Sequence, residues 1–191
     1  AHNTVVVDGL DSSELADEWK FNTWAKSKIR TWSTTETFDF VDGSHDGYHR
    51  LNAPVTHRRR IIFIKPFFWL VVDDLKSEGQ HQYDQYFHFG KGADVKISGL
   101  QVEATYGHKA GISWIPVHKP GMNIERFKGN TDPIQGWVSY DYGIKEPAEV
   151  VKYSIKTKSI QLATLLVPFG HSSVNCNLSS IENDAFHINF G

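Results

Sequence analysis

The stretch GSHDGYHRL at residues 43–51 gathers residue types that could bind an acidic sugar. Tyr48 or His49 could contact the sugar, and the guanidinium of Arg50 could pair with a saccharide carboxylate. Loops carry binding residues more often than cores do. The structural alternative is a loop between two strands, with Tyr48 packed inward and two glycines supporting the turn. The glycines favour this alternative, and Tyr48, His49 and Arg50 are kept as candidate substrate contacts.

Histidines are the second group that could carry chemistry. His45, His49 and His57 lie close enough in sequence to suggest a metal site. Their spacing lacks a carboxylate partner in a familiar pattern, so ordinary loop and strand histidines are favoured over metal ligands. His81 and His88 belong to one alternating segment and fall on opposite faces of it. We therefore do not expect these two to hold one ion.

Other chemistries are disfavoured by what the sequence contains. It has no Gly-x-Ser-x-Gly elbow, phosphate loop or dinucleotide fingerprint, and we assign no catalytic residue. The formal net charge of −2 gives no broad basic field for nucleic acid. The one dense basic run, HRRRI at 57–61, would split its arginines between two faces of a strand, which favours a solvated sheet face. The apolar run at 67–72 is too short to cross a membrane.

The segments that must position these residues read as strands. Segment 81–89 alternates, with Tyr83, Gln85 and Phe87 on one face, and Lys65-Pro66 separates the apolar segments 60–64 and 67–75. Regular short strands with turns between them predict an all-β fold, an antiparallel β-sandwich, with one minor short helix at 11–19. We expect the sandwich over residues 1–170 and a terminal strand pair or small appended sheet over 171–191.

Two further features concern aromatic side chains and the only cysteine. Trp114, Trp137, Tyr140 and Tyr142 could form a platform for sugar rings, although alternation at 137–142 predicts that one face belongs to the core. The lone Cys176 cannot form an internal disulfide and matches no metal-type spacing. The redox environment of the protein therefore stays open.

Several strings in this sequence occur in the order found in one known family, and together they cover most of residues 2–168. The strings are HNTVVVDG at 2–9, WSTTETFDFVDGSHDGYHRL at 32–51, VTHRRRIIFIKPFFWLVVDDLKSEGQHQYDQYFHF at 55–89, GWVSYDYGIKEPAEVVKYS at 136–154 and LATLLVP at 162–168. The chain resembles the C-terminal β-domain of the heparinase II/III-like polysaccharide lyases. The resemblance starts at the HNT motif, and the family's N-terminal α/α toroid is absent from this sequence.

The resemblance implies an activity for the parent protein. Lyases of this family cleave uronate-containing polysaccharides, such as heparin, heparan sulfate or alginate-like chains, by β-elimination. The family's catalytic residues precede the HNT motif, so none is carried onto this chain, and we expect the chain alone to be inactive. The resemblance also implies a structural zinc whose ligands include the His of that motif, here His2. The other zinc ligands precede this sequence, so the site is incomplete here.

The remaining expectations concern partners and location. The resemblance implies an acidic polysaccharide as ligand, the toroid as intramolecular partner, and a bacterial periplasmic or secreted location. We expect no nucleic-acid or membrane partner. The strand at Val5–Val7 follows so closely on residue 1 that we expect its sheet to begin in preceding sequence, which leaves an exposed seam for self-association. The alternative function is a non-catalytic carbohydrate-binding β-sandwich module.

Overall fold

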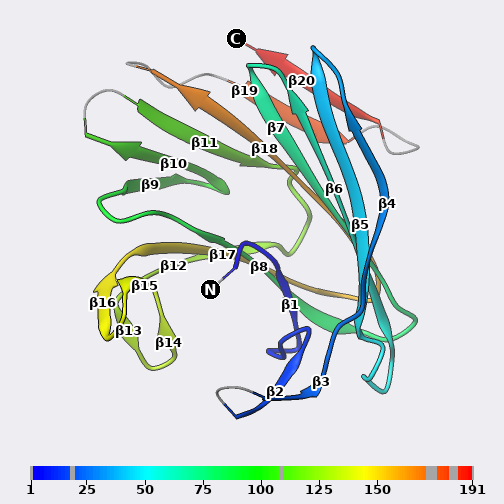
Figure 1. The fold of residues 1–191 in the computed structure, drawn as a ribbon. Helices are drawn as coiled ribbons and strands as arrows, with labels where there is room; N and C mark the ends of the chain where they lie inside the picture. Colours follow the sequence, from blue (N-terminus) through cyan, green and yellow to red (C-terminus); the bar gives the residue numbers. More distant parts are fainter. Residues whose placement is uncertain (1, 18–19, 108–109, 171–175, 181–184, 191) are drawn as a thin grey trace.

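The computed structural model describes residues 2–17, 20–107, 110–170, 176–180 and 185–190. In this part of the chain every regular element is a strand, and no helix that could span a membrane is present. Two antiparallel layers form the body of the domain (Figure 1). The antiparallel β-sandwich predicted from the sequence is therefore confirmed.

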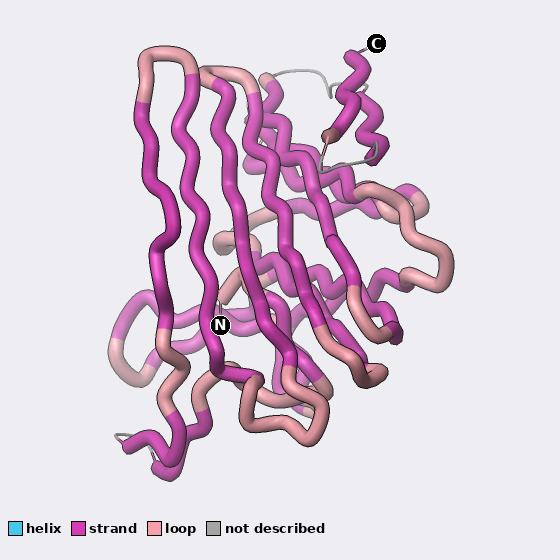
Figure 2. Tube along the Cα trace, turned by 90° about the vertical axis from the view of Figure 1, so that its right-hand side faces the viewer, coloured by secondary structure: helices cyan, strands magenta, loops and turns pink. Residues whose placement is uncertain are grey.

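The larger layer is an eight-stranded sheet whose long strands β4–β7 lie side by side (Figure 2). Consecutive strands of this group are joined by short turns, which is typical of an antiparallel meander. In spatial order the strands are β4 (Ser27–Thr34), β5 (Phe38–Tyr48), β6 (Val55–Ile64), β7 (Phe68–Lys76), β18 (Ile160–Phe169), β11 (Ala110–Pro116), β10 (Gln101–Tyr106) and β9 (Asp94–Ser98). Lys65 and Pro66 lie in the β6–β7 turn, as predicted.

The smaller layer is a four-stranded sheet that packs against one face of the larger layer. Its strands in spatial order are β1 (Val5–Val7), β8 (His81–His88), β17 (Glu149–Thr157) and β12 (Asn123–Lys128). Four two-stranded sheets complete the fold: β2 (Glu14–Asp17) with β3 (Lys20–Thr23), β13 (Asn130–Thr131) with β14 (Ile134–Gln135), β15 (Trp137–Asp141) with β16 (Ile144–Pro147), and β19 (Cys176–Ser180) with β20 (Phe186–Phe190).

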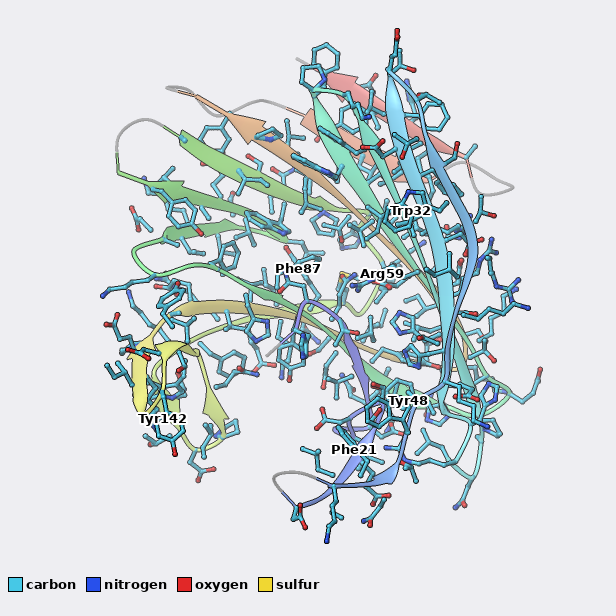
Figure 3. The ribbon with its side chains drawn as sticks, in the orientation of Figure 1. Phe21, Trp32, Tyr48, Arg59, Phe87 and Tyr142 are labelled. Carbon is cyan, nitrogen blue, oxygen red and sulfur yellow. The ribbon has the colours of Figure 1, made fainter. Side chains whose placement is uncertain are left out.

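The main core lies between the two layers and follows the alternation predicted for segment 81–89. Tyr83, Gln85, Phe87 and Phe89 are all buried, and the residues between them are half-buried. Phe87 points into the space between the layers in Figure 3, where its ring meets those of Trp114 and Tyr153. The period-2 pattern thus identified the core face of β8 correctly.

A second, smaller core lies on the opposite face of the eight-stranded sheet. It joins Leu70, Val72 and Leu165 of that sheet to Leu178, with Phe186 and Ile188 packed against it from β20. The strand pair β19–β20 thus covers part of the outer face of the sheet. The division of the chain into units at residue 170 stays a prediction, and residues 171–175 and 181–184 lie outside the described part.

The helix predicted at residues 11–19 is wrong. Glu14–Asp17 forms strand β2 and pairs with β3, while residues 18 and 19 lie outside the described part. The side chain of Ser13 bonds outside the segment, because its Oγ accepts a hydrogen bond from the backbone N–H of Ala25 at 3.0 Å. So short a helix is marginal without tertiary support, and strand pairing replaces it here.

Candidate functional site

The inner face of the eight-stranded sheet carries a buried carboxylate, Asp73 of β7, whose residue is 0% exposed. Its two oxygens accept hydrogen bonds from Arg59 Nε and Nη2 at 2.6 and 2.7 Å and from His57 Nε2 at 2.7 Å. Gln85 Nε2 of the facing layer donates a fourth bond at 2.8 Å. Figure 3 shows Arg59 lying between the layers. A buried carboxylate with this many donors is held in one geometry.

The network continues from His57 to His45 of β5. His57 Nδ1 lies 2.9 Å from His45 Nε2, and the backbone N–H of Gly47 donates to His45 Nδ1 at 3.2 Å. Because His45 Nδ1 accepts from Gly47, its proton must sit on Nε2 and point to His57 Nδ1. His57 must then carry its own proton on Nε2, which faces Asp73. The hydrogen bonds therefore specify one neutral tautomer for each ring.

Gly47 makes this end of the network possible by its lack of a side chain. A Cβ at this position would lie 2.3 Å from the backbone oxygen of Ser12 and 2.8 Å from the Cβ of Ala25. Any larger residue would push β5 away from the segments that contain Ser12 and Ala25. The N–H that orients His45 is thus fixed by close backbone approach.

Burial and charge determine the ionisation of the two ends of the network. Burial raises the pKa of Asp73, but the charge of Arg59 and the hydrogen bonds from His57 and Arg59 outweigh it and hold this pKa well below its usual range. Burial and, to a smaller extent, the neighbouring His57 lower the pKa of His45 to about 4. At neutral pH an ionised carboxylate therefore faces Arg59, and His45 is neutral.

A cavity of about 310 Å³ opens in front of His45, and its wall combines apolar side chains with polar and charged ones. Its lining includes Thr4, Ile29, Val41, His45, Arg59 and Ile61. Both ring nitrogens of His45 already have partners, so this histidine is not poised to take a proton from a substrate. The arrangement orients Arg59 and His45 at the cavity wall rather than providing acid and base groups.

The candidate contacts from segment 43–51 have separate positions. Tyr48 is 1% exposed and its hydroxyl donates to the backbone oxygen of Val5 at 3.0 Å, an inward packing that matches the structural alternative (Figure 3). His49 is exposed, and its Nε2 lies 2.9 Å from Thr56 Oγ1. The Arg50 guanidinium donates to the backbone oxygens of Asp11, Ser12 and Gly47. A role for Tyr48, His49 and Arg50 in substrate binding stays a prediction.

His2 lies at a different cavity, of about 360 Å³, that opens on the four-stranded sheet. Asp11, His88 and Trp137 are among the other residues that line it. Within the described residues, no group of three or more histidine, cysteine or carboxylate side chains is placed to hold a metal ion. His2 with the other described residues does not by itself make a zinc site, so a zinc ion bound there would need ligands beyond the described residues.

The other predicted groups are dispersed. His81 is buried and its Nδ1 lies 2.6 Å from Asp8 Oδ2, whereas the backbone N–H and Nδ1 of His88 face Asn3 Oδ1. The two histidines therefore have separate partners.

On the β15–β16 hairpin, Tyr140 and Tyr142 are 66% and 101% exposed. Their partner in the sequence pattern, Trp137, is half-buried and donates from Nε1 to the backbone oxygen of Asn130 at 2.8 Å.

The fold and the buried network define an antiparallel, two-layered β-domain, and comparison with known sequences identifies its class. The family model described as "Heparinase II/III-like, C-terminal" matches residues 1–177. The chain therefore belongs to the heparinase II/III-like family as its C-terminal region, and the resemblance seen in the sequence is confirmed. Among curated protein sequences, none matches this chain.

Solved structures with the same fold come from proteins of this kind. A heparan sulfate lyase HepC from Pedobacter heparinus is similar with a TM-score of 0.80 and 13% identity, covering 99% of this chain and 28% of that one. A structure titled Heparinase III has a TM-score of 0.71 and 14% identity, covering 99% of this chain and 29% of its own. These low identities show a shared fold. The chain spans less than a third of the length of these proteins.

Proposed function

We propose that this chain is the β-sheet region of a polysaccharide lyase that cleaves uronate-containing chains by β-elimination. The observation that carries the proposal is the match of the heparinase II/III-like C-terminal family to residues 1–177. The similar solved structures include a heparan sulfate lyase, which supports a heparin- or heparan-sulfate-like substrate, with alginate-like uronans as the second substrate class. In this proposal the chain supports one wall of the substrate cleft.

The reaction determines which groups the rest of the protein must supply. A base removes the proton on C5 of the uronate, the C4–O bond breaks, and its departing oxygen takes a proton from an acid. The electrons of the C5–H bond form the new C4–C5 double bond. A group that neutralises the uronate carboxylate makes the C5 proton acidic enough to remove. No residue of this chain is assigned to these roles, because the resemblance implies that the family's catalytic residues precede the HNT motif. Both histidines of the buried network are, in addition, fully bonded.

The inner face of β4–β7 is the surface that suits contact with the rest of such a protein. Ile29 and Trp32 of β4 are 65% and 71% exposed, and Phe63 and Trp69 stack with ring centroids 4.2 Å apart. Trp32 is labelled on this part of the sheet in Figure 3. Two exposed apolar side chains beside a half-buried aromatic pair support an interaction surface on this face. In the proposal this face meets the toroid, or preceding strands that pair with the edge strand β1.

A test compares the intact parent protein with the 191-residue chain on heparin, heparan sulfate and alginate. The expected result is ultraviolet-absorbing unsaturated uronate product from the parent and none from this chain. Product from the chain alone would contradict the assignment of the chemistry to other regions. Tight binding of these uronans without elimination by the parent would favour the alternative, a non-catalytic carbohydrate-binding module.

The zinc proposal rests on His2 and on ligands outside this chain. Metal analysis of the intact protein should find about one zinc per chain, because structural zinc sites are closed four-coordinate sites. His2→Ala should lower that content, whereas His49→Ala, which removes an exposed histidine elsewhere, should leave it unchanged. Equal zinc content in the two variants would show that His2 is not a zinc ligand.

A bacterial periplasmic or secreted location remains part of the proposal and is tested by cell fractionation.

Two further proposals concern surfaces. His49 and Arg50 are proposed to contact substrate, with Tyr48 holding the segment through its bond to Val5. An unchanged KM for uronan substrates in the intact parent protein with His49→Ala/Arg50→Ala would rule this out.

The exposed inner face and the edge of β1 are proposed to drive self-association of the separate chain. Sedimentation of the chain as a monomer at all concentrations would rule that out.

A further inference from the structure

The outer face of β4–β7 carries a group of charges that the buried network does not involve. Alternation along β6 sends Arg59 to the inner face and Arg58 and Arg60 to the outer face, so the run of three arginines serves both sides of the sheet. In the register of the sheet, Arg58 stands between Ser44 of β5 and Asp74 of β7. We call the following residues the outer charge cluster: Arg30, Asp42, Arg58, Arg60, Asp74 and Lys76.

The carboxylates of the outer charge cluster both accept hydrogen bonds from arginines of the cluster. Asp42 accepts from Arg58 Nε and Nη2 at 2.8 and 2.6 Å. Asp74 accepts from Arg60 Nη2 at 2.7 Å and from Gln161 Nε2 at 2.9 Å. The hydrogen bonds from Arg58 hold the pKa of Asp42 below its usual range against the effect of burial, and the charges of Arg58, Arg30 and Arg60 act in the same direction.

Cations outnumber carboxylates in the outer charge cluster by four to two. Within the described residues, neither Arg30 nor Lys76 forms an ion pair with a carboxylate, and both are exposed. Arg30 Nε donates a hydrogen bond to a neutral group, Ser44 Oγ, at 3.4 Å. The outer charge cluster therefore carries a formal charge of +2, although the net charge of the whole chain is −2.

The two exposed cations stand around one depression. A cavity of about 180 Å³ is lined by Arg30, Thr56, Arg58, Asp74 and Lys76. At ~30 Å³ per water molecule this space holds about six waters, which is room for a sulfate or carboxylate group and part of its sugar ring. Arg30 and Lys76 approach from different strands, so one anion can be contacted from two sides. Charged donors of this kind form short, strong hydrogen bonds with anionic oxygens.

We propose that the outer charge cluster binds the sulfate or carboxylate groups of an acidic polysaccharide at a site on the opposite face of the sheet from Asp73. The choice of polysaccharide rests on the proposed function, whereas the anion site rests on the charges and the cavity. Such a site holds a long substrate chain near the protein while another segment of it is cleaved. The positive excess raises the local concentration of a polyanion and speeds its encounter with the protein.

The test measures binding of a heparin octasaccharide to the full chain at two salt concentrations. Arg30→Ala/Lys76→Ala should weaken binding about tenfold or more, because both unpaired cations are lost. The matched control is Lys96→Ala/Lys158→Ala, which removes two exposed cations outside the cluster and should stay within about twofold of the wild type. Wild-type binding should weaken as salt rises, and the Arg30/Lys76 variant should respond less. Thermal unfolding of both variants checks that the fold is kept.

Several results would overturn the proposal. Unchanged octasaccharide affinity in Arg30→Ala/Lys76→Ala, or an equal loss in the lysine control, would show that the cluster is not the site. Inorganic sulfate or a short DNA duplex binding as tightly as the octasaccharide would contradict a polysaccharide site. Eliminase activity of the intact parent separates this proposal from the preceding one. Cluster-dependent binding without any elimination would refute the lyase assignment and leave the anion site intact.

Discussion

The two faces of the β6–β7 strand pair carry the same residue types, arginine and aspartate, but in different roles. Inward, Arg59 and Asp73 face each other with His57 and Gln85, and Asp73 is 0% exposed. Outward, Arg58 and Arg60 neutralise Asp42 and Asp74, and exposed cations remain beside them. Every oxygen of the inner carboxylate is used within the domain, whereas the outer face keeps a net charge. The inner group is therefore suited to fix the two layers, and the outer group to attract an anion.

The largest expected effect is on the inner face. Asp73→Asn should destabilise the domain by about 3 kcal/mol, because it removes the charge that faces the half-buried Arg59 guanidinium and breaks a fully bonded buried carboxylate network. Urea denaturation of the variant and the wild type measures the difference in the free energy of unfolding. A loss as small as that of an exposed ion pair would show that water or a rearranged Arg59 replaces the carboxylate. The contrast between the two faces would then fail.

The second effect is a pH dependence at the other end of the same network. The pKa of His45 is lowered to about 4 in the folded state, against about 6.5 in the unfolded chain. The unfolded state therefore takes up the proton first as the pH falls from about 6.5 to about 4, and stability is lost in that window. Partial exposure of His45 reduces this loss below that of Asp73→Asn.

Denaturation of the wild type and of His45→Gln at pH 7 and pH 4.5 tests this dependence. The variant should lose less stability than the wild type between these two values. His49→Gln is the matched control, because His49 is exposed and bonded only to Thr56 among the contacts given above, and it should behave like the wild type. Asp73, whose pKa is lowered, contributes a separate loss below about pH 4, where the unfolded carboxyl takes up its proton. Equal pH responses of all three proteins would exclude His45 as the source.

These expectations separate what the sequence could predict from what it could not. Alternation alone identified the core face of β8 and sent the arginines of β6 to opposite faces, because the side-chain period of a strand does not depend on its neighbours. Alternation could not identify the buried network of His45, His57 and Asp73. His45 meets His57 because β5 and β6 pair in one register, and an irregularity between His45 and Tyr48 shifts the residues beyond it. His49, an equally plausible partner by spacing, therefore bonds to Thr56.

The failed helix at residues 11–19 has the same physical cause. The serines and acids of this segment favour a helix start, but the outcome was decided by contacts distant in sequence. Ser13 bonds to Ala25, and Arg50 holds the backbone oxygen of Ser12. Local propensity is a weak signal when such contacts are available. The family, by contrast, could be identified from strings that extend over the whole sandwich.

The third effect compares the stability lost on removing the outer carboxylate, Asp42, with that lost on removing the inner one, Asp73. Asp42→Asn should cost about 1 kcal/mol, because the Arg58 side chain that it pairs with is 37% exposed and can be solvated when the carboxylate is lost. The same urea measurement applies, with Asp73→Asn as the direct comparison. A cost for Asp42→Asn that equals the cost for Asp73→Asn would mean that the outer charge cluster is as structural as the inner network.

The smallest expected effect concerns the two exposed cations of the outer charge cluster. Arg30→Ala/Lys76→Ala should change the free energy of unfolding by no more than about 0.5 kcal/mol, as surface substitutions usually do. Removal of two like charges beside Arg58 and Arg60 also relieves repulsion, so a slight gain in stability is compatible with the proposal. Urea denaturation at low and high salt checks it. A clear destabilisation would assign Arg30 and Lys76 to the folded framework, whereas unchanged stability is the result that the proposed anion site requires.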